Sequence, residues 1–249
     1  MYNPFSLENK TILVTGASSG IGRAIAIECS KMGAKVIISA RNEERLNETL
    51  SQMSGAGHSI IVADLNNEND RKNLIEQLPT LDGLVNCAGL TKTLPFQFMN
   101  ADALESVMNV NFTAPTLITA SLIKKKKLTK GSSIVFISSV SGVFVGGSPA
   151  GSIYSASKGA VNGMARNMAI DLADKNIRVN CVNPGMIDTA IFDEGVITAE
   201  QLEEDRKRYP LKRYGKPEEV AYAVIYLLSD ASQWVTGSNL LIDGGYTLN

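Results

Sequence analysis

The feature that most constrains the fold is an alternation of short apolar runs with longer segments of helical periodicity. The apolar, β-branched runs of strand length are residues 11–15, 35–39, 59–62, 81–86, 133–138, 178–183 and 239–242. Helical spacing occupies about residues 20–32, 42–53, 67–78, 102–126, 152–173 and 215–229. Short apolar strands separated by helices predict a parallel sheet covered on both faces. Because no linker or repeat interrupts the pattern, we expect one doubly wound α/β domain over residues 1–249.

The charge balance argues against two classes of protein. Lys and Arg total 24 and Asp and Glu total 25, for a formal net charge of -1. This leaves neither a basic field for nucleic acid nor the acidic excess typical of disorder. The chain starts without a signal-peptide pattern, and residues 221–228 are far shorter than the roughly 20 apolar residues of a membrane-spanning helix. We therefore expect a cytoplasmic protein that binds neither nucleic acid nor membrane.

The single histidine, His58, limits the possible chemistry. A metal site with two His ligands is impossible, and a Ser-His-Asp triad would have to use His58. We predict no metal site, and we expect His58 to be a loop residue without a chemical role. If the protein is an enzyme, another group moves its protons. Cys29, Cys87 and Cys181 lie far apart in apolar stretches, which favours free buried thiols.

A glycine-rich turn, residues 16–22 (GASSGIG), joins the first predicted strand to the first helix. Its glycines allow a tight turn and close helix packing, and they let a pyrophosphate approach the N–H groups at the positive helix end. A turn that merely connects two elements is the alternative. The position at the start of a βαβ unit favours a dinucleotide site in a Rossmann-like domain.

Tyr154 and Lys158 lie four residues apart in the predicted helix 152–173, so they share a helix face. An unperturbed tyrosine titrates near pH ~10, and a nearby ammonium favours the phenolate and lowers that pKa. From spacing alone, two unrelated surface residues are an equal alternative. The pair nevertheless suggests a tyrosine that exchanges protons with help from a lysine.

These motifs together resemble the short-chain dehydrogenase/reductase family, whose members bind NAD or NADP and interconvert carbonyls and alcohols. The turn has the family's G-x-x-x-G-x-G spacing, and Asp64 follows the third strand as the family's adenine-side Asp does. Residues 86–89 (NCAG), 183–189 (NPGMIDT) and 243–245 (DGG) are similar to its later motifs. The resemblance runs from about residue 8 to the end. It departs at Cys87, where the family has an Asn whose amide could stabilise the turn.

The resemblance implies a catalytic tetrad of Asn111, Ser139, Tyr154 and Lys158. It implies that Tyr154 is the acid/base, that Lys158 contacts the nicotinamide ribose, and that Ser139 hydrogen bonds the substrate oxygen. Asn111 would help to hold a proton-relay water. Neighbours of the same type, Ser138 and Asn109, remain alternatives.

The resemblance also implies which residues bind the cofactor. They are Gly16, Ser18, Ser19, Gly20, Ile21, Gly22, Arg41, Asp64, Leu65, Asn86, Ala88, Gly89, Tyr154, Lys158, Pro184, Gly185, Ile187 and Thr189. At the end of the second strand, Ala40 occupies the position of the acidic residue that would select NAD, and Arg41 follows it. A guanidinium pairs bidentately with phosphate. NADP(H) is therefore favoured over NAD(H), although Ser19 is not the second basic residue that many NADP-binding members have, and a solvated Arg41 is the alternative.

The substrate is less well specified. The expected lid, residues 190–209, and the run 210–217 resemble the 3-oxoacyl-(acyl-carrier-protein) reductases of fatty acid biosynthesis. Residues 124–127 (KKKK) and Lys130 could attract an acidic carrier, or could simply complement a helix C-terminus. A dehydrogenase or reductase of a sugar, steroid or small ketone is the enzymatic alternative, and a non-catalytic dinucleotide-binding scaffold or sensor is another. The resemblance further implies a homotetramer with interfaces on the long middle helices and the C-terminal region.

Overall fold

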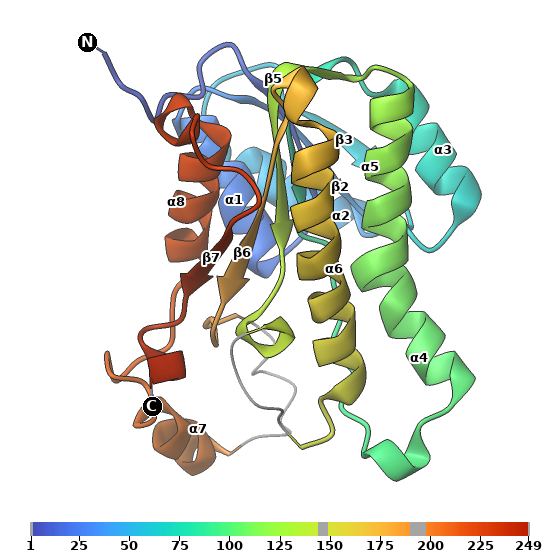
Figure 1. The fold of residues 1–249 in the computed structure, drawn as a ribbon. Helices are drawn as coiled ribbons and strands as arrows, with labels where there is room; N and C mark the ends of the chain where they lie inside the picture. Colours follow the sequence, from blue (N-terminus) through green and yellow to red (C-terminus); the bar gives the residue numbers. More distant parts are fainter. Residues whose placement is uncertain (1, 144–148, 190–197, 249) are drawn as a thin grey trace.

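The computed structural model describes residues 2–143, 149–189 and 198–248. Its centre is a seven-stranded parallel sheet in the order β3-β2-β1-β4-β5-β6-β7 (Figure 1). The strands are β1 (Thr11–Thr15), β2 (Lys35–Ala40), β3 (Ser59–Val62), β4 (Leu81–Asn86), β5 (Leu128–Ile137), β6 (Arg178–Pro184) and β7 (Asn239–Ile242). The predicted doubly wound, Rossmann-like α/β fold is confirmed.

Helices cover both faces of the sheet (Figure 1). They are α1 (Gly20–Lys31), α2 (Glu43–Ser51), α3 (Glu68–Gln77), α4 (Ala101–Met108), α5 (Ala114–Lys124), α6 (Ser152–Asp171), α7 (Ala199–Arg206) and α8 (Pro217–Leu228). Alternate residues of β1 divide between two cores: Ile12 and Val14 pack with α1 and α8, and Leu13 packs with α3, α5 and α6. This two-sided burial explains why the strands are apolar throughout.

The long helix predicted over residues 102–126 is interrupted. A π-helical turn, Asn109–Thr113, separates α4 from α5. Pro115 has no N–H to give to the carbonyl four residues earlier, so the regular ladder cannot continue there. The extra residue of the π turn lets Asn111 point into the domain, where it is buried. The sequence pattern detected the helix but not this break.

His58 precedes β3, as predicted, and it has a structural contact. Its Nδ1 accepts a hydrogen bond from the backbone N–H of Val36 (3.1 Å), and its Nε2 lies 2.9 Å from the carbonyl oxygen of Ser54. The ring therefore links the start of β2 to the loop after α2. No helix among the residues described meets the length and apolarity that crossing a bilayer requires.

The two-sided core gives a stability prediction with a matched control. Val14 is fully buried in the central strand β1, whereas Val62 is 46% exposed on the edge strand β3. Val14→Ala should lower the free energy of unfolding by about 2 kcal/mol, because two buried methyl groups are lost and a cavity remains. Val62→Ala should change it by less than about 0.5 kcal/mol. Urea titration of both variants tests this, and equal losses would contradict the burial described.

Candidate active site

The predicted site residues converge at the carboxyl edge of the sheet. The glycine-rich turn follows β1, residues 87–89 follow β4, which ends at Asn86, Ser138 and Ser139 follow β5, and Gly185 follows β6. Strand order reverses between β1 and β4, the position where open α/β sheets place their ligands. The topology thus brings together motifs that are distant in sequence.

The glycine-rich turn passes too close to its neighbours for side chains. Gly16 has φ +70°, and a Cβ there would lie 2.7 Å from the Cα of Ala88. A Cβ at Gly22 would overlap the carbonyl oxygen of Gly16. Ser19 precedes α1, and its side chain makes no capping hydrogen bond to the N–H groups at the positive end of the helix. These features suit the approach of an anionic group.

Arg23 and Thr49 hold this turn, and sequence reasoning missed both. The Arg23 guanidinium donates to the carbonyl oxygen of Ser18 (2.6 Å) and to Glu48 (2.8 Å), and its Nε donates to Thr49 Oγ1 (3.0 Å). Thr49 Oγ1 in turn donates to the carbonyl oxygen of Ala17 (2.9 Å). Helix α2 therefore supports the turn directly through Thr49 and indirectly through Glu48, which pairs with Arg23 of α1. Only a tertiary contact identifies them, because neither residue belongs to a recognisable spacing.

Thr15 stabilises the turn after β4. Its Oγ1 accepts hydrogen bonds from the backbone N–H groups of Cys87 (3.2 Å) and Ala88 (3.3 Å). Asn86 is buried and donates from Nδ2 to Thr119 Oγ1 on α5 (3.3 Å). The loss of an amide at Cys87 therefore does not leave the backbone of this turn without partners.

The π turn directs Asn111 toward α6. Its Oδ1 accepts from the N–H of Leu90 (2.9 Å), and its Nδ2 donates to the carbonyl oxygen of Leu90 (2.9 Å) and to Ser157 Oγ (3.0 Å). Ser157 lies between Tyr154 and Lys158 in sequence. Asn111 is thus the asparagine of this turn whose side chain reaches the Tyr–Lys helix, which favours it over Asn109.

The two candidate serines have different partners. Ser138 Oγ donates to the carbonyl oxygen of Lys158 (3.1 Å) and accepts from Asn162 Nδ2 (2.8 Å), so it joins β5 to α6. The Ser139 side chain interacts with Tyr154 and lowers the pKa of its phenol. Ser139 Oγ also accepts from the N–H of Ser141 at the start of a 3-10 turn (3.2 Å). This geometry favours Ser139 as the serine beside the reacting group.

Tyr154 and Lys158 share a face of α6, with Lys158 Nζ 5.7 Å from the centre of the Tyr154 ring. Lys158 is buried, and its Nζ donates to the carbonyl oxygen of Ile137 (2.8 Å). Burial lowers the pKa of Lys158 to about 8. Burial also raises the pKa of Tyr154, a rise that the hydrogen bond with Ser139 opposes.

The prediction that Lys158 lowers the pKa of Tyr154 is therefore wrong for this structure. The ammonium is directed to the Ile137 carbonyl rather than to the phenol oxygen. The pKa of Tyr154 is raised because burial removes water from the phenol and so favours its neutral form. The spacing of four residues correctly placed both side chains on one helix face, but it contains no information on where the lysine amine points.

The segment after β6 packs on the C-terminal residues. The N–H of Gly185 donates to the carbonyl oxygen of Ile242 (2.8 Å), and a Cβ at Gly185 would lie 3.1 Å from the Cα of Asp243. Thr189, at the end of the segment, is 3.4 Å from a Cβ built at Gly20. The predicted nicotinamide-side segment and the predicted phosphate-side turn therefore face each other at one edge.

The remaining predicted cofactor residues lie at the same edge. Arg41 is exposed directly after β2, and Asp64 and Leu65 follow the neighbouring strand β3. Asp64 is half-buried, and its carboxylate accepts from the N–H of Asn66 (3.0 Å). Among the residues described, no cluster of three His, Cys, Asp or Glu side chains has the arrangement of a metal site.

The lysine-rich run lies at the opposite edge. Residues 124–127 precede β5, where Leu128 pairs with Leu81 at the start of β4, whereas the candidate serines follow the other end of β5. Lys127 Nζ donates to the carbonyl oxygens of Ile75, Glu76 and Leu78 at the end of α3. The hypothesis of a carrier-binding patch beside the cleft is therefore wrong. The alternative, that these lysines serve a helix end, applies directly to Lys127.

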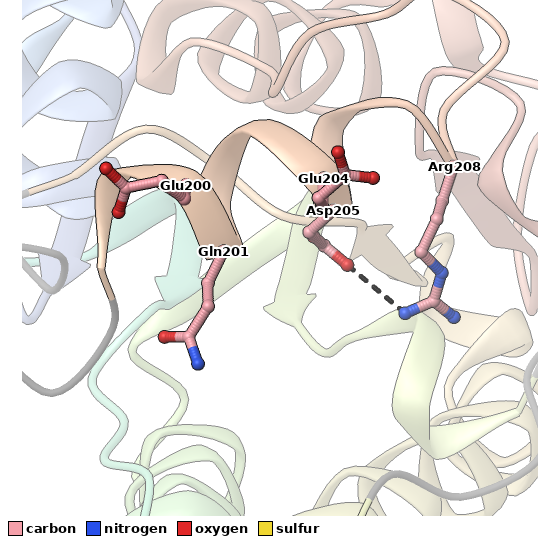
Figure 2. Close-up of a pocket in the computed structure, with 5 residues that line it drawn as sticks. All are labelled: Glu200, Gln201, Glu204, Asp205 and Arg208. Atoms are coloured by element: carbon pink, nitrogen blue, oxygen red, sulfur yellow. Dashed lines mark hydrogen bonds and ion pairs between the residues drawn. The ribbon is translucent and has the colours of Figure 1, made fainter.

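Part of the predicted lid, residues 190–197, lies outside the described residues. The remainder forms α7, which starts with a capping box between Thr198 and Gln201. Five residues on α7 and just after it line a shallow pocket of about 580 Å³: Glu200, Gln201, Glu204, Asp205 and Arg208 (Figure 2). Asp205 and Arg208 form an ion pair there (3.1 Å). None of the predicted tetrad lines this pocket.

A doubly wound domain with a glycine-rich turn at its switch point and a Tyr–Lys pair at the same edge has the architecture of a dinucleotide-dependent oxidoreductase. A family model described as enoyl-(acyl carrier protein) reductase matches residues 16–247. The chain is 38% identical over 240 residues to the 3-oxoacyl-[acyl-carrier-protein] reductase FabG of Rickettsia bellii, covering 96% of this chain and 97% of that protein. It is 37% identical over 252 residues to a tropinone reductase homolog of Arabidopsis thaliana, covering 98% and 95%.

Solved structures agree with these matches. The Pseudomonas aeruginosa RhlG/NADP active-site complex has a TM-score of 0.91 at 31% identity, covering 99% of this chain and all of that one. A dehydrogenase/reductase from Sinorhizobium meliloti 1021 has a TM-score of 0.87 at 35% identity, covering 98% and 97%. The chain belongs to the short-chain dehydrogenase/reductase family.

The close packing of the glycine-rich turn can be tested with two matched substitutions. Gly22→Ala should abolish detectable binding of NADPH, because the new Cβ forces the turn away from Gly16. Gly163→Ala on α6 should leave binding unchanged and should stabilise the protein by up to ~1 kcal/mol, since nothing lies within 4 Å of the added methyl. Nucleotide titration followed by fluorescence measures NADPH binding by both variants. Normal binding by the Gly22 variant would show that the turn does not hold the cofactor.

Proposed function

We propose that the chain is an NADP(H)-dependent reductase of a 3-oxoacyl group, working as a single dinucleotide-binding domain with Tyr154 as its acid/base. The observation that carries this proposal is the placement of Tyr154 and the buried Lys158 on one face of α6, with Lys158 Nζ 5.7 Å from the centre of the Tyr154 ring, at the switch-point edge. A phenol, a second hydroxyl and a buried lysine are the groups that proton transfer to a carbonyl oxygen needs.

The backbone at the switch point supports dinucleotide binding. Gly16, Gly20 and Gly22 keep the turn free of side chains where a pyrophosphate would approach, and the start of α1 supplies N–H donors. Ser18, Ser19 and Ile21 complete that turn. Asp64, Leu65, Asn86, Ala88 and Gly89 would surround the adenosine half, and Pro184, Gly185, Ile187 and Thr189 would hold the nicotinamide half. Bound NADPH supplies the hydride of the reaction.

Arg41 supports NADP(H) over NAD(H). It is exposed after β2, one residue beyond Ala40, so no carboxylate stands at the position that would repel a 2′-phosphate. The RhlG complex contains NADP, and a structural neighbour from Agrobacterium tumefaciens also has NADP bound. Arg41 would pair with the phosphate in two hydrogen bonds.

The protonation states fit reduction of a carbonyl. Because burial raises the pKa of Tyr154, its phenol is neutral near pH 7 and can donate a proton to the developing alkoxide. Ser139 would hydrogen bond the same oxygen and stabilise its charge. Lys158, with a pKa near 8, is largely protonated at pH 7 and would contact the nicotinamide ribose. Asn111, fixed between Leu90 and Ser157, would hold the water that returns a proton to the site.

A 3-oxoacyl thioester is the proposed substrate because the FabG proteins of several Rickettsia species and of Thermotoga maritima are similar along nearly the whole chain. The tropinone reductase homolog supports a second candidate, a small or cyclic ketone. The phenol of Tyr154 and the buried Lys158 on one face of α6 argue against a non-catalytic binder, since dinucleotide binding alone has no use for the phenol. NADPH oxidation with a short 3-oxoacyl thioester, beside ketones, sugars and steroids, distinguishes these functions.

We further propose a homotetramer acting in the cytoplasm. Leu104 on α4 and Leu117 on α5 expose apolar surface on the middle helices. Trp234, beside the C-terminal strand, is fully exposed, so it does not belong to the core of this subunit and fits an interface. Light scattering coupled to size exclusion measures the assembly directly.

Tyr154→Phe tests the acid/base assignment. Removing the hydroxyl should lower kcat by about 10²- to 10⁴-fold, the usual contribution of general acid catalysis, and should leave NADPH affinity within twofold. Tyr222→Phe, on the exposed face of α8, is the matched control and should keep wild-type turnover. Steady-state kinetics and fluorescence titration give both quantities. Near wild-type turnover in the Tyr154 variant would refute the assignment.

Arg41→Ala tests cofactor selection. Loss of a charged hydrogen-bonding partner should raise the KM for NADPH by about 10- to 100-fold and leave the KM for NADH nearly unchanged. Arg45→Ala, an exposed arginine on the adjacent α2, provides the control for general loss of positive charge. If both substitutions raise the KM for NADPH equally, the preference for NADPH comes from the overall positive charge of this region and not from Arg41.

A further inference from the structure

Tyr209 is a buried tyrosine that contacts the proposed nicotinamide segment from outside the tetrad. It lies three residues after α7 and is only 4% exposed. Its hydroxyl oxygen accepts a hydrogen bond from the backbone N–H of Met186 (3.3 Å). Met186 directly follows Pro184 and Gly185. A side chain from the α7 region therefore touches the backbone of the segment that would hold the nicotinamide.

Two other backbone groups of this segment pair with Gly215. Gly215 donates its N–H to the carbonyl oxygen of Met186 (3.0 Å) and accepts from the N–H of Asp188 (2.8 Å), so Ile187 pairs with Gly215 as in a parallel ladder. The N–H of Met186 is directed to Tyr209 instead. The phenol thus supplies the hydrogen-bond acceptor for the backbone N–H of the residue next to Gly185.

The ring of Tyr209 is fixed between α7 and the C-terminal residues. It stacks on Tyr246 with centres 4.8 Å apart, and it meets Tyr214 edge to face at 5.6 Å. The Tyr214 hydroxyl donates to Asp205 on α7 (3.0 Å), and the Tyr246 hydroxyl accepts from Arg208 (2.6 Å). Asp205 and Arg208 are themselves paired (Figure 2). Packing against the rings of Tyr214 and Tyr246 therefore holds the Tyr209 ring beside α7.

The Tyr209 phenol is suited to positioning and not to proton transfer. Burial raises its pKa to about 12, so it is neutral over the working range of an enzyme. A neutral phenol keeps one geometry as pH changes. In a water-poor setting, a single hydrogen bond to a backbone N–H holds that backbone more firmly than in water.

We propose that Tyr209 is a positioning residue that couples α7 to the nicotinamide-binding segment, so that the substrate side and the cofactor side of the site are placed together. The inference rests on the proposed function, since it concerns where that cofactor's nicotinamide end is held. The inference predicts different effects on the two halves of the cofactor. Loss of the Tyr209 hydroxyl should weaken binding of the nicotinamide half of NADP(H) and leave binding of the adenosine half unchanged.

Three single-atom deletions test this in the full-length protein: Tyr209→Phe, Tyr214→Phe and Tyr246→Phe. Each keeps its ring and loses one hydroxyl of the same aromatic cluster. Dissociation constants are measured for NADPH and for adenosine 2′,5′-bisphosphate, which lacks the nicotinamide. Tyr209→Phe should raise the dissociation constant of NADPH by about three- to tenfold, the range expected for one hydrogen bond. It should change the dissociation constant of the bisphosphate by less than twofold. The two control variants should leave the ratio of the two constants unchanged.

Hydrogen exchange gives a readout that needs no ligand. In Tyr209→Phe the amide of Met186 should exchange faster than in the wild type, and in the two controls it should not. With substrate, Tyr209→Phe should lower kcat as well as raise the KM for NADPH, whereas a purely structural loss would reduce only the amount of active enzyme.

The inference is overturned if Tyr209→Phe weakens both ligands equally, or leaves both NADPH binding and Met186 exchange unchanged. A wild-type protein that binds neither ligand would instead refute the proposed function, and with it this inference. That result appears before any variant is made, so the two failures are distinguishable.

Discussion

The site depends on the contact of three backbone segments at the switch point of the sheet. Gly16, Gly22 and Ala88 lie so close together that a single added Cβ would meet backbone atoms. This contact lets α1 start directly over the end of β1, and it sets the distance between the turns after β1 and β4. The remaining motifs are then placed by strand register alone, because each follows the carboxyl end of a strand paired with its neighbour. Close packing at glycine is thus the geometric basis of both the fold and the proposed cofactor site.

Buried polar side chains then fix the proton-transfer groups relative to this frame. Asn111 joins the turn after β4 to α6, and Ser138 joins β5 to α6 through Asn162. Each bond is made away from water, where a satisfied polar group rigidifies and an unsatisfied one is costly. Helix α6 is therefore oriented from two sides, with Tyr154 and Lys158 on the face between them. The proposed catalytic groups are held by hydrogen bonds from at least three separate elements.

The sequence predicted the strands, the doubly wound fold and the edge at which the motifs meet, because continuous apolar runs and the 3.6-residue helical period both depend on local burial. It did not predict the break at Asn109–Thr113, which requires both the missing donor of Pro115 and the distant partners of Asn111. It also gave the wrong direction for the pKa of Tyr154, since the amine of Lys158 is directed by the Ile137 carbonyl. The sequence also did not reveal the roles of Arg23, Thr49 and Tyr209. These residues act through contacts between separate elements, which no local sequence pattern records.

The two hydrogen bonds that Thr15 accepts have a consequence for how this protein can change over evolutionary time. The backbone of the turn after β4 is satisfied from β1, so the side chain at position 87 has no part in holding it. A substitution at that position therefore removes neither of these two hydrogen bonds from the turn. A thiol in place of an amide is one such variation, and it alters the polarity next to Tyr154 and Lys158 at little structural cost. Position 87 is therefore a place where selection can tune the chemistry while the scaffold stays constant.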